Sequence, residues 1–92
     1  MYLVICYDIV SNRRRSRLFR RMKDYLPRVQ KSVFEGEMPD SRFGSLLEMI
    51  RKQMDQEVDT VRIYHLCKRC ITNITWLGVG PVPNDEWNDI II

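Results

Sequence analysis

The chain begins with a nearly continuous apolar stretch, MYLVICYDIV, that is rich in residues favouring β-strands. In an extended strand the side chains alternate between two faces, and here both faces are largely apolar. One face carries Leu3, Ile5, Tyr7 and Ile9. The other face carries Tyr2, Val4, Cys6 and Asp8. This pattern predicts a central strand that is covered on both sides.

The next segment carries its apolar residues at helical spacing. We expect a helix over residues 13–26, with Ser11 or Asn12 as its N-cap and Pro27 ending it. The apolar stripe consists of Leu18, Phe19, Met22, Tyr25 and Leu26. Arginines lie off that stripe, on the opposite side or on its flanks: Arg13, Arg14, Arg17, Arg20 and Arg21.

Further strands and a second helix follow. The pattern over residues 28–38 predicts a strand region that is bent or bulged near Gly36. The pattern over residues 39–54 predicts a helix capped by Asp40 or Ser41. The apolar stripe of that helix is Phe43, Leu46, Leu47, Ile50 and Met54. Residues 59–66 predict a third strand, in which Val61 and Ile63 alternate with Arg62 and Tyr64. The composition of residues 71–79 predicts a fourth strand, and that of residues 86–92 predicts a short last strand.

If residues 28–38 fold as a hairpin, the order becomes βαββαβ, the plan of the ferredoxin-like α+β fold. Both helices would then cover one face of an antiparallel sheet. We expect residues 1–78 to form this core and residues 79–92 to form a C-terminal tail. The second face of the first strand also needs cover, which another copy of the chain supplies most simply. The sequence therefore predicts a homodimer through the sheet.

The charge of the chain is unevenly distributed. Nine of its 15 Lys and Arg residues fall between Ser11 and Lys31, where Asp24 is the one acid. This concentration of positive charge indicates that the chain binds a polyanion, for example nucleic acid. The alternative is that these residues form a helix face that is simply exposed to solvent. No apolar run approaches the roughly 18 residues of a membrane span, and no signal peptide is visible. With three cysteines, these features favour a cytoplasmic protein.

Asp8 is the first candidate for chemistry, because a carboxylate at the end of an apolar strand needs a partner. One alternative is that it caps the next turn or pairs with an arginine. The other is that it binds Mg²⁺, with two copies of Asp8 meeting across a two-fold axis. The arginines at the start of the helix disfavour helix formation there, which indicates that they bind phosphate.

Two further motifs carry candidate residues. Lys31, Ser32 and Phe34 could contact phosphate and stack on a base, although Phe34 also suits a core position. Cys67 and Cys70 with His65 make half of a zinc site. A redox pair is disfavoured because we do not expect these thiols to open a helix after a strand, and half-buried thiols are the simpler interpretation. His65 is either a general acid or base or a space-filling residue.

Taken together, YLVICYDI, the arginine-rich helix, QKSVFEGEM and DTVRIYHL resemble the second of the two universal CRISPR-associated adaptation proteins, the Cas-two family. The resemblance covers roughly Met1 to Gly78. It implies a ferredoxin-like homodimer in which residues 86–92 pack on the partner's sheet. It also implies that Asp8 binds Mg²⁺ or Mn²⁺ between the protomers and is the catalytic residue. Asn12 stands where some relatives carry a second acid, which weakens this metal site.

The activity implied by the resemblance is metal-dependent endonuclease cleavage of RNA or duplex DNA, in CRISPR adaptation (spacer acquisition). One alternative is a non-catalytic DNA-binding scaffold that assembles with the integrase subunits. Another is a related toxin-type ribonuclease. The expected nucleic-acid-binding residues are Tyr7, Arg13, Arg14, Arg15, Arg17, Arg20, Arg21, Lys31, Ser32 and Phe34.

Overall fold

One antiparallel sheet organises the chain in a computed structural model, which describes residues 1–75 and 77–79. The strands are β1 (Tyr2–Asp8), β2 (Arg28–Gln30), β3 (Val33–Glu37) and β4 (Thr60–Leu66). The helices are α1 (Asn12–Met22), the 3-10 turn η1 (Asp40–Arg42), α2 (Phe43–Gln53) and α3 (Lys68–Ile71). The strand order β2-β3-β1-β4, with every neighbouring pair antiparallel, confirms the ferredoxin-like α+β fold.

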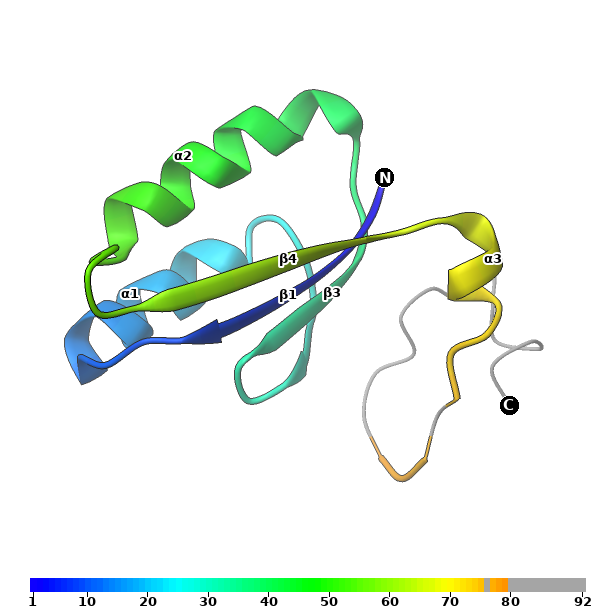
Figure 1. Cartoon of the computed structure of the whole chain (residues 1–92), viewed down its shortest axis with the longest axis horizontal. Coiled ribbons are helices and arrows are strands. Elements are labelled where there is room, and N and C mark those ends of the chain that lie inside the picture. The colour runs from blue at the N-terminus through cyan, green and yellow to red at the C-terminus, as the bar shows by residue number, and fades with distance from the viewer. Residues whose placement is uncertain (76, 80–92) are drawn as a thin grey trace.

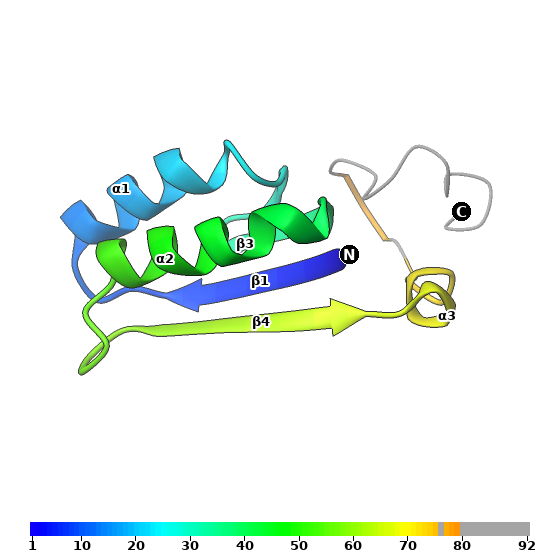
Figure 2. The same cartoon turned by 90° about the horizontal axis from the view of Figure 1, so that it is seen from above.

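The molecule has two layers, because α1 and α2 both lie on the same face of the sheet (Figures 1 and 2). The core fills the space between these layers. Its fully buried members come from β1 and the residue that follows it, from β3 and from both helices, and include Leu3, Ile5, Ile9, Leu18, Met22, Phe34 and Leu46. The opposite face of the sheet has no helix over it in the described part of the chain, and we call it the open face.

Helix α1 follows the predicted pattern at its start and ends early. The Ser11 hydroxyl accepts a hydrogen bond from the Arg14 N–H at 3.3 Å, so Ser11 is the N-cap. The helix ends at Met22 rather than Leu26, and turns follow it. After Met22 the chain tightens into turns in which the N–H groups of Asp24 and Tyr25 donate hydrogen bonds to the carbonyls three residues before them, at 3.2 and 2.9 Å. Pro27 then disfavours helical dihedral angles at Leu26.

Two local predictions for the middle of the chain are wrong. The irregularity in the hairpin lies between Arg28 and Gln30 rather than near Gly36. Gly36 instead leaves room for Pro27, whose Cδ would lie 3.2 Å from a Cβ at that position. Neither Asp40 nor Ser41 caps α2, because the turn η1 comes before it and the residue at its N-cap position is Arg42, which makes no capping bond.

The end of the described chain also differs from the prediction. Residues 71–75 and 77–79 contain no strand, and Lys68–Ile71 form the one-turn helix α3. The side chains of Thr72 and Asn73 donate hydrogen bonds to the Arg69 carbonyl at 2.9 and 3.0 Å, which stabilises the helical turn instead of a strand. The predicted last strand, residues 86–92, lies outside the described residues. No helix in the described part is long and apolar enough to cross a membrane.

Candidate nucleic-acid and metal site at the end of strand β1

Asp8 is the last residue of β1 and lies on the open face, opposite Thr60 of β4. Its side chain is exposed. Within the described part of the chain, no hydrogen bond or ion pair reaches its carboxylate, so it neither caps a turn nor pairs with an arginine there. Asp8 is therefore available to a ligand that comes from outside the protomer.

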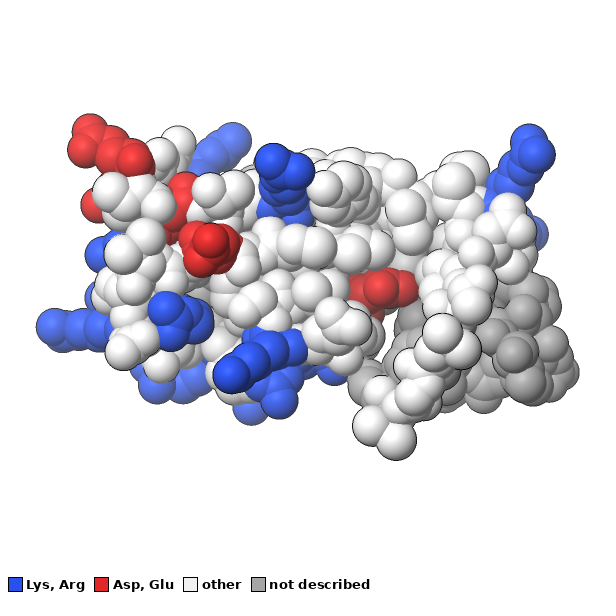
Figure 3. Space-filling model, turned by 60° about the horizontal axis from the view of Figure 1, so that its bottom comes forward, with Lys and Arg blue, Asp and Glu red and all other residues white. Residues whose placement is uncertain are grey.

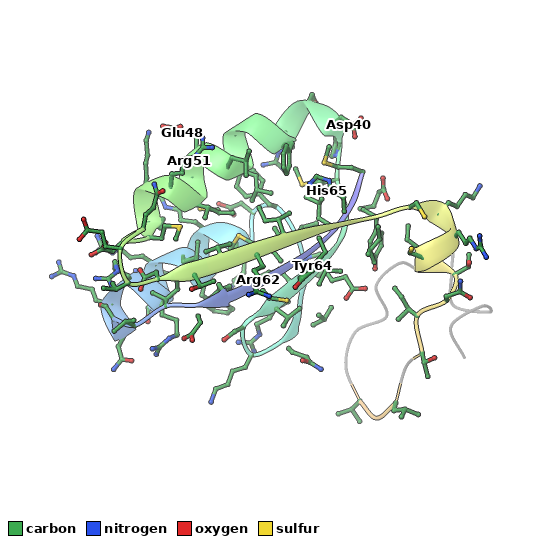
Figure 4. The ribbon with its side chains drawn as sticks, viewed as in Figure 1. Asp40, Glu48, Arg51, Arg62, Tyr64 and His65 are labelled. Atoms are coloured by element: carbon green, nitrogen blue, oxygen red, sulfur yellow. The ribbon has the colours of Figure 1, made fainter. Side chains whose placement is uncertain are left out.

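Arg62 is a basic residue on the same face that the sequence analysis did not select as a site residue. It lies opposite Cys6 in the register, which makes it the diagonal neighbour of Asp8, about 7–8 Å away by ordinary sheet geometry. Figure 4 shows Arg62 and Tyr64 on the side of β4 away from α2, whereas His65 lies on the side of α2. The alternation of Arg62 with Val61 and Ile63 was the signal that could have identified it.

Arg14 is not free to bind nucleic acid, because its guanidinium is held by Asp59. Arg14 Nε and Nη2 donate hydrogen bonds to the two carboxylate oxygens of Asp59 at 2.9 and 3.1 Å. Asp59 also accepts the backbone N–H groups of Val10 at 2.9 Å and Asp55 at 2.8 Å. The pair therefore ties the start of α1 to the loop before β4, and the prediction of a phosphate-binding Arg14 is corrected.

Asp59 is the most strongly perturbed carboxylate in the described structure. Its side chain is fully buried, and the hydrogen bonds from Arg14 hold its pKa well below the ordinary value against the opposing effect of burial. Sequence reasoning missed Asp59 because its partner is distant along the chain. A buried acid just before a strand gives no local signal.

The remaining arginines of α1 are exposed to solvent. Arg13, Arg17 and Arg20 follow one another at i, i+4 and i+7, so they form a row along one side of the helix. We call these three residues the arginine row, and Arg21 lies on its flank. No side-chain ion pair holds any of them within the described residues. Figure 3 shows Lys and Arg side chains gathered mainly toward one end and one edge of the molecule.

Arg15 lies apart from the arginine row, beside a shallow hollow of about 180 Å³. The hollow is lined by Tyr7, Arg15, Ser16, Phe19, Arg28 and Lys31. Arg15 is oriented by hydrogen bonds to the Asn12 side chain at 2.6 Å and to the Ile9 carbonyl at 2.8 Å. Burial raises the pKa of Tyr7, and the nearby Arg28 and Arg15 partly oppose this rise. The hollow thus brings together Tyr7, Arg15 and Lys31, which are side chains that can contact a phosphate or a base.

Phe34 does not belong to this surface. Its ring is fully buried and packs against Tyr7 and Phe19, with ring centroids 6.2 and 5.9 Å away. The register pairs Phe34 with Ile5, which directs the ring toward the helices. A base cannot reach the ring in this structure, so its expected stacking role is corrected to a core role. Lys31 is exposed and Ser32 is half-buried, and both lie in the turn between β2 and β3.

The cysteine motif also differs from expectation. Cys67 and Cys70 are free and exposed rather than half-buried, and they follow β4 directly at the start of α3. Their sulfurs are 3.5 Å apart. His65 packs edge-on against Phe43 with ring centroids 5.1 Å apart, on the face opposite Asp8. Among the described residues no three His, Cys, Asp or Glu side chains are grouped to hold a metal.

The fold and the site define a small ferredoxin-like protein that carries a strand-end carboxylate beside a basic helix. The family model described as CRISPR associated protein Cas2 matches residues 1–74. The chain therefore belongs to the Cas2 family of CRISPR-associated proteins, which confirms the resemblance drawn from its motifs.

Individual relatives agree with this assignment. A protein of Frankia alni named "CRISPR-associated endoribonuclease Cas2" is 35% identical, over 94% of this chain and 97% of the relative. A protein of Thermus thermophilus named "CRISPR-associated endonuclease Cas2 2" is also 35% identical, over 86% of this chain and 83% of the relative. The crystal structure of Streptococcus pyogenes Cas2 at pH 6.5 superposes with a TM-score of 0.74 and 26% identity, covering 85% of this chain and 100% of that chain.

Proposed function

We propose that this protein is a metal-dependent endonuclease of CRISPR adaptation that acts as a homodimer on RNA or duplex DNA in the cytoplasm. The observation that carries the proposal is Asp8 at the corner that leads into the arginine-rich helix α1, because its carboxylate is exposed and has no hydrogen bond or ion pair to the described residues. The names of the relatives, which include both endoribonuclease and endonuclease, support nucleic-acid cleavage. The free cysteines fit a reducing compartment.

The residues present fit a divalent metal only if two protomers contribute. In the described part of one chain, Asp8 does not belong to any group of three His, Cys, Asp or Glu side chains that could hold a metal. Mg²⁺ or Mn²⁺ requires several oxygen ligands, which two copies of Asp8, water and a substrate phosphate would supply. A metal bound there would polarise a phosphoryl oxygen and make a bound water more acidic.

The open face supports a second copy of this chain as the partner. Val4, Cys6 and Val33 on this face are partly exposed, and Tyr64 keeps 47% of its surface exposed. Nearby, Leu77 and Val79 are almost completely exposed, and both line a hollow of about 360 Å³ with Cys6 and Val33. A two-fold dimer through this face would cover these apolar side chains and bring the two Asp8 residues toward one another.

The other residues of the site bind and neutralise the substrate. The arginine row would hold the nucleic-acid backbone without reading its sequence. Arg62, diagonal to Asp8, would face the negative charge that develops on the phosphate during cleavage. His65 cannot act as the general base there because it lies on the opposite face of β4. We therefore expect slow turnover.

A specific observation favours a second candidate function, a DNA-binding scaffold for integrase subunits. All three residues of the arginine row are exposed, whereas no group of three metal-ligating side chains is present among the described residues. Phosphate binding by the arginine row needs neither Asp8 nor a metal. The two functions therefore depend on different residues, and variants can separate them.

The test compares wild type, Asp8→Asn, and a variant in which the arginine row is changed to Ala. Labelled single-stranded RNA and duplex DNA are incubated with Mg²⁺ or with a chelator, and cleavage and gel-shift binding are measured in parallel. We expect Asp8→Asn to lose cleavage while keeping binding, and the arginine variant to lose binding. Metal-independent cleavage, or equal rates for wild type and Asp8→Asn, would refute the nuclease proposal.

Asp24→Asn is the matched control, because Asp24 is an exposed acid in the turn after α1 and the change in net charge is the same. It should cleave like wild type. Binding of duplex DNA by wild type and by Asp8→Asn, without cleavage by either protein, would identify the scaffold as the function.

A further inference from the structure

The corner between β4 and α3 holds two thiols within reach of one another. Cys67 comes directly after β4 and Cys70 lies within α3, and the helical turn places their sulfurs 3.5 Å apart. The turn is closed by the Ile71 N–H, which donates a hydrogen bond to the Cys67 carbonyl at 3.1 Å. Both cysteines are exposed, so reagents in solution can reach them.

The two thiols differ in their surroundings. The backbone N–H and the thiol of Cys70 face the Cys67 sulfur and lower the pKa of Cys67. The same contact raises the pKa of Cys70, first because the Cys70 thiol is hydrogen-bonded to Cys67, and second because a negative charge on Cys67 disfavours another one beside it. Lys68 and Arg69, between the two cysteines in sequence, add positive charge nearby. The thiolate therefore forms first on Cys67, and the thiolate is the nucleophilic form of cysteine.

The third cysteine does not belong to this pair. Cys6 lies on β1 in the middle of the sheet and is half-buried. No third His, Cys, Asp or Glu joins Cys67 and Cys70 in the described residues, whereas tetrahedral zinc sites use three or four protein ligands. The arrangement is that of a dithiol rather than of a metal centre built from one chain.

We propose that Cys67 and Cys70 form a thiol–disulfide exchange site for small-molecule disulfides, in which Cys67 attacks and Cys70 resolves. The Cys67 thiolate forms a bond with one sulfur of the small disulfide, whose S–S bond breaks to release one thiolate. Cys70 then loses its proton and attacks Cys67 Sγ, which releases the second thiolate. Two protein thiols are oxidised to one disulfide, and the small disulfide is reduced to two thiols that take up the two protons.

The site lies where the chain leaves the sheet. Ile71 is buried next to Cys70, and the following residues Ile74 and Leu77 line the hollow against the open face. A disulfide would fix the turn from which this segment starts. Reversible disulfides of this kind are compatible with a cytoplasmic protein.

The test uses the full chain in buffers of oxidised and reduced glutathione. The reaction is stopped by acid, free thiols are alkylated, and peptides are identified by mass spectrometry. We expect wild type to accumulate an internal Cys67–Cys70 disulfide while Cys6 stays reduced. Cys70→Ser should stop at a glutathione adduct on Cys67. Cys67→Ser should form its adduct on Cys70 several-fold more slowly, because the more nucleophilic thiol is gone.

Two controls separate the effect of the structure from that of sequence spacing. The same reaction in concentrated urea measures the unfolded chain, which should close the disulfide several-fold more slowly. Cys6→Ser should react like the wild type. Stable adducts on both Cys67 and Cys70 without an internal disulfide would overturn the proposal. Equal adduct rates for Cys70→Ser and Cys67→Ser would also overturn it.

Discussion

The arginine row predicts how steeply nucleic-acid binding falls as salt rises. Arg13, Arg17 and Arg20 lie along one side of α1, and none is held by an ion pair in the described structure. Each phosphate neutralised on duplex DNA contributes about 0.9 to the slope of log K against log salt, so three contacts contribute about 2.7. Raising the salt from about 50 to about 200 mM should therefore weaken wild type about 40-fold more than the Arg13, Arg17 and Arg20 to Ala variant.

The assay is fluorescence anisotropy of a labelled duplex titrated at four salt concentrations. Alanine is a good helix former, so the triple variant should keep its fold, which circular dichroism checks. The control variant changes Arg51, Lys68 and Arg69 to Ala. It removes the same net charge, with two of its three residues on α3, at the end of the molecule away from the start of α1 (Figure 2). Parallel plots for wild type and the triple variant would refute the assignment of phosphate contacts to the arginine row.

Two further predictions concern the residues that support the site. Phe34→Ala should destabilise the fold by about 3–5 kcal/mol, since it empties a fully buried position. Phe34→Leu should lose less stability and keep the wild-type affinity for single-stranded RNA and duplex DNA in the anisotropy assay, whereas weaker binding at every salt concentration would restore the stacking role. For Asp59, whose pKa Arg14 lowers, the stabilisation is complete above the unfolded pKa of about 4 and is lost as the pH falls below it. In urea unfolding, the stability gap between wild type and Asp59→Asn should therefore be full at neutral pH and shrink in acid. A gap that is constant down to the acid range would contradict this origin.

The sequence predicted the fold well because the pattern of apolar residues reports directly on which side of each element is buried. The two faces of β1, the stripe of α1 and the alternation of β4 all follow from this pattern. One failure lies where local side-chain hydrogen bonds decide the conformation. Thr72 and Asn73 stabilise a turn in a segment that otherwise has the composition of a strand.

The candidate site was harder to predict because it depends on which residues meet in space. Asp8 and the exposed arginines follow from their positions in the sequence, whereas the Arg14–Asp59 pair joins residues far apart along the chain. Arginines that are adjacent in sequence therefore have different roles: Arg14 stabilises the fold, whereas Arg13 is exposed to solvent. The burial of Phe34 likewise follows from the register of β3 on β1, which the sequence alone does not fix.

The central position of β1 has a consequence for the way this protein is synthesised. Of the four described strands, β1 emerges first from the ribosome, yet one of its two neighbours is β4, which emerges last. Until β4 is complete, β1 presents an unpaired edge and uncovered apolar side chains to other nascent chains. Pairing β1 with β4 closes a loop about twice as long as pairing it with β3, which costs only about 0.6 kcal/mol more. The order of synthesis, rather than the entropy of loop closure, therefore determines when the exposed edge of β1 is paired and no longer available for aggregation.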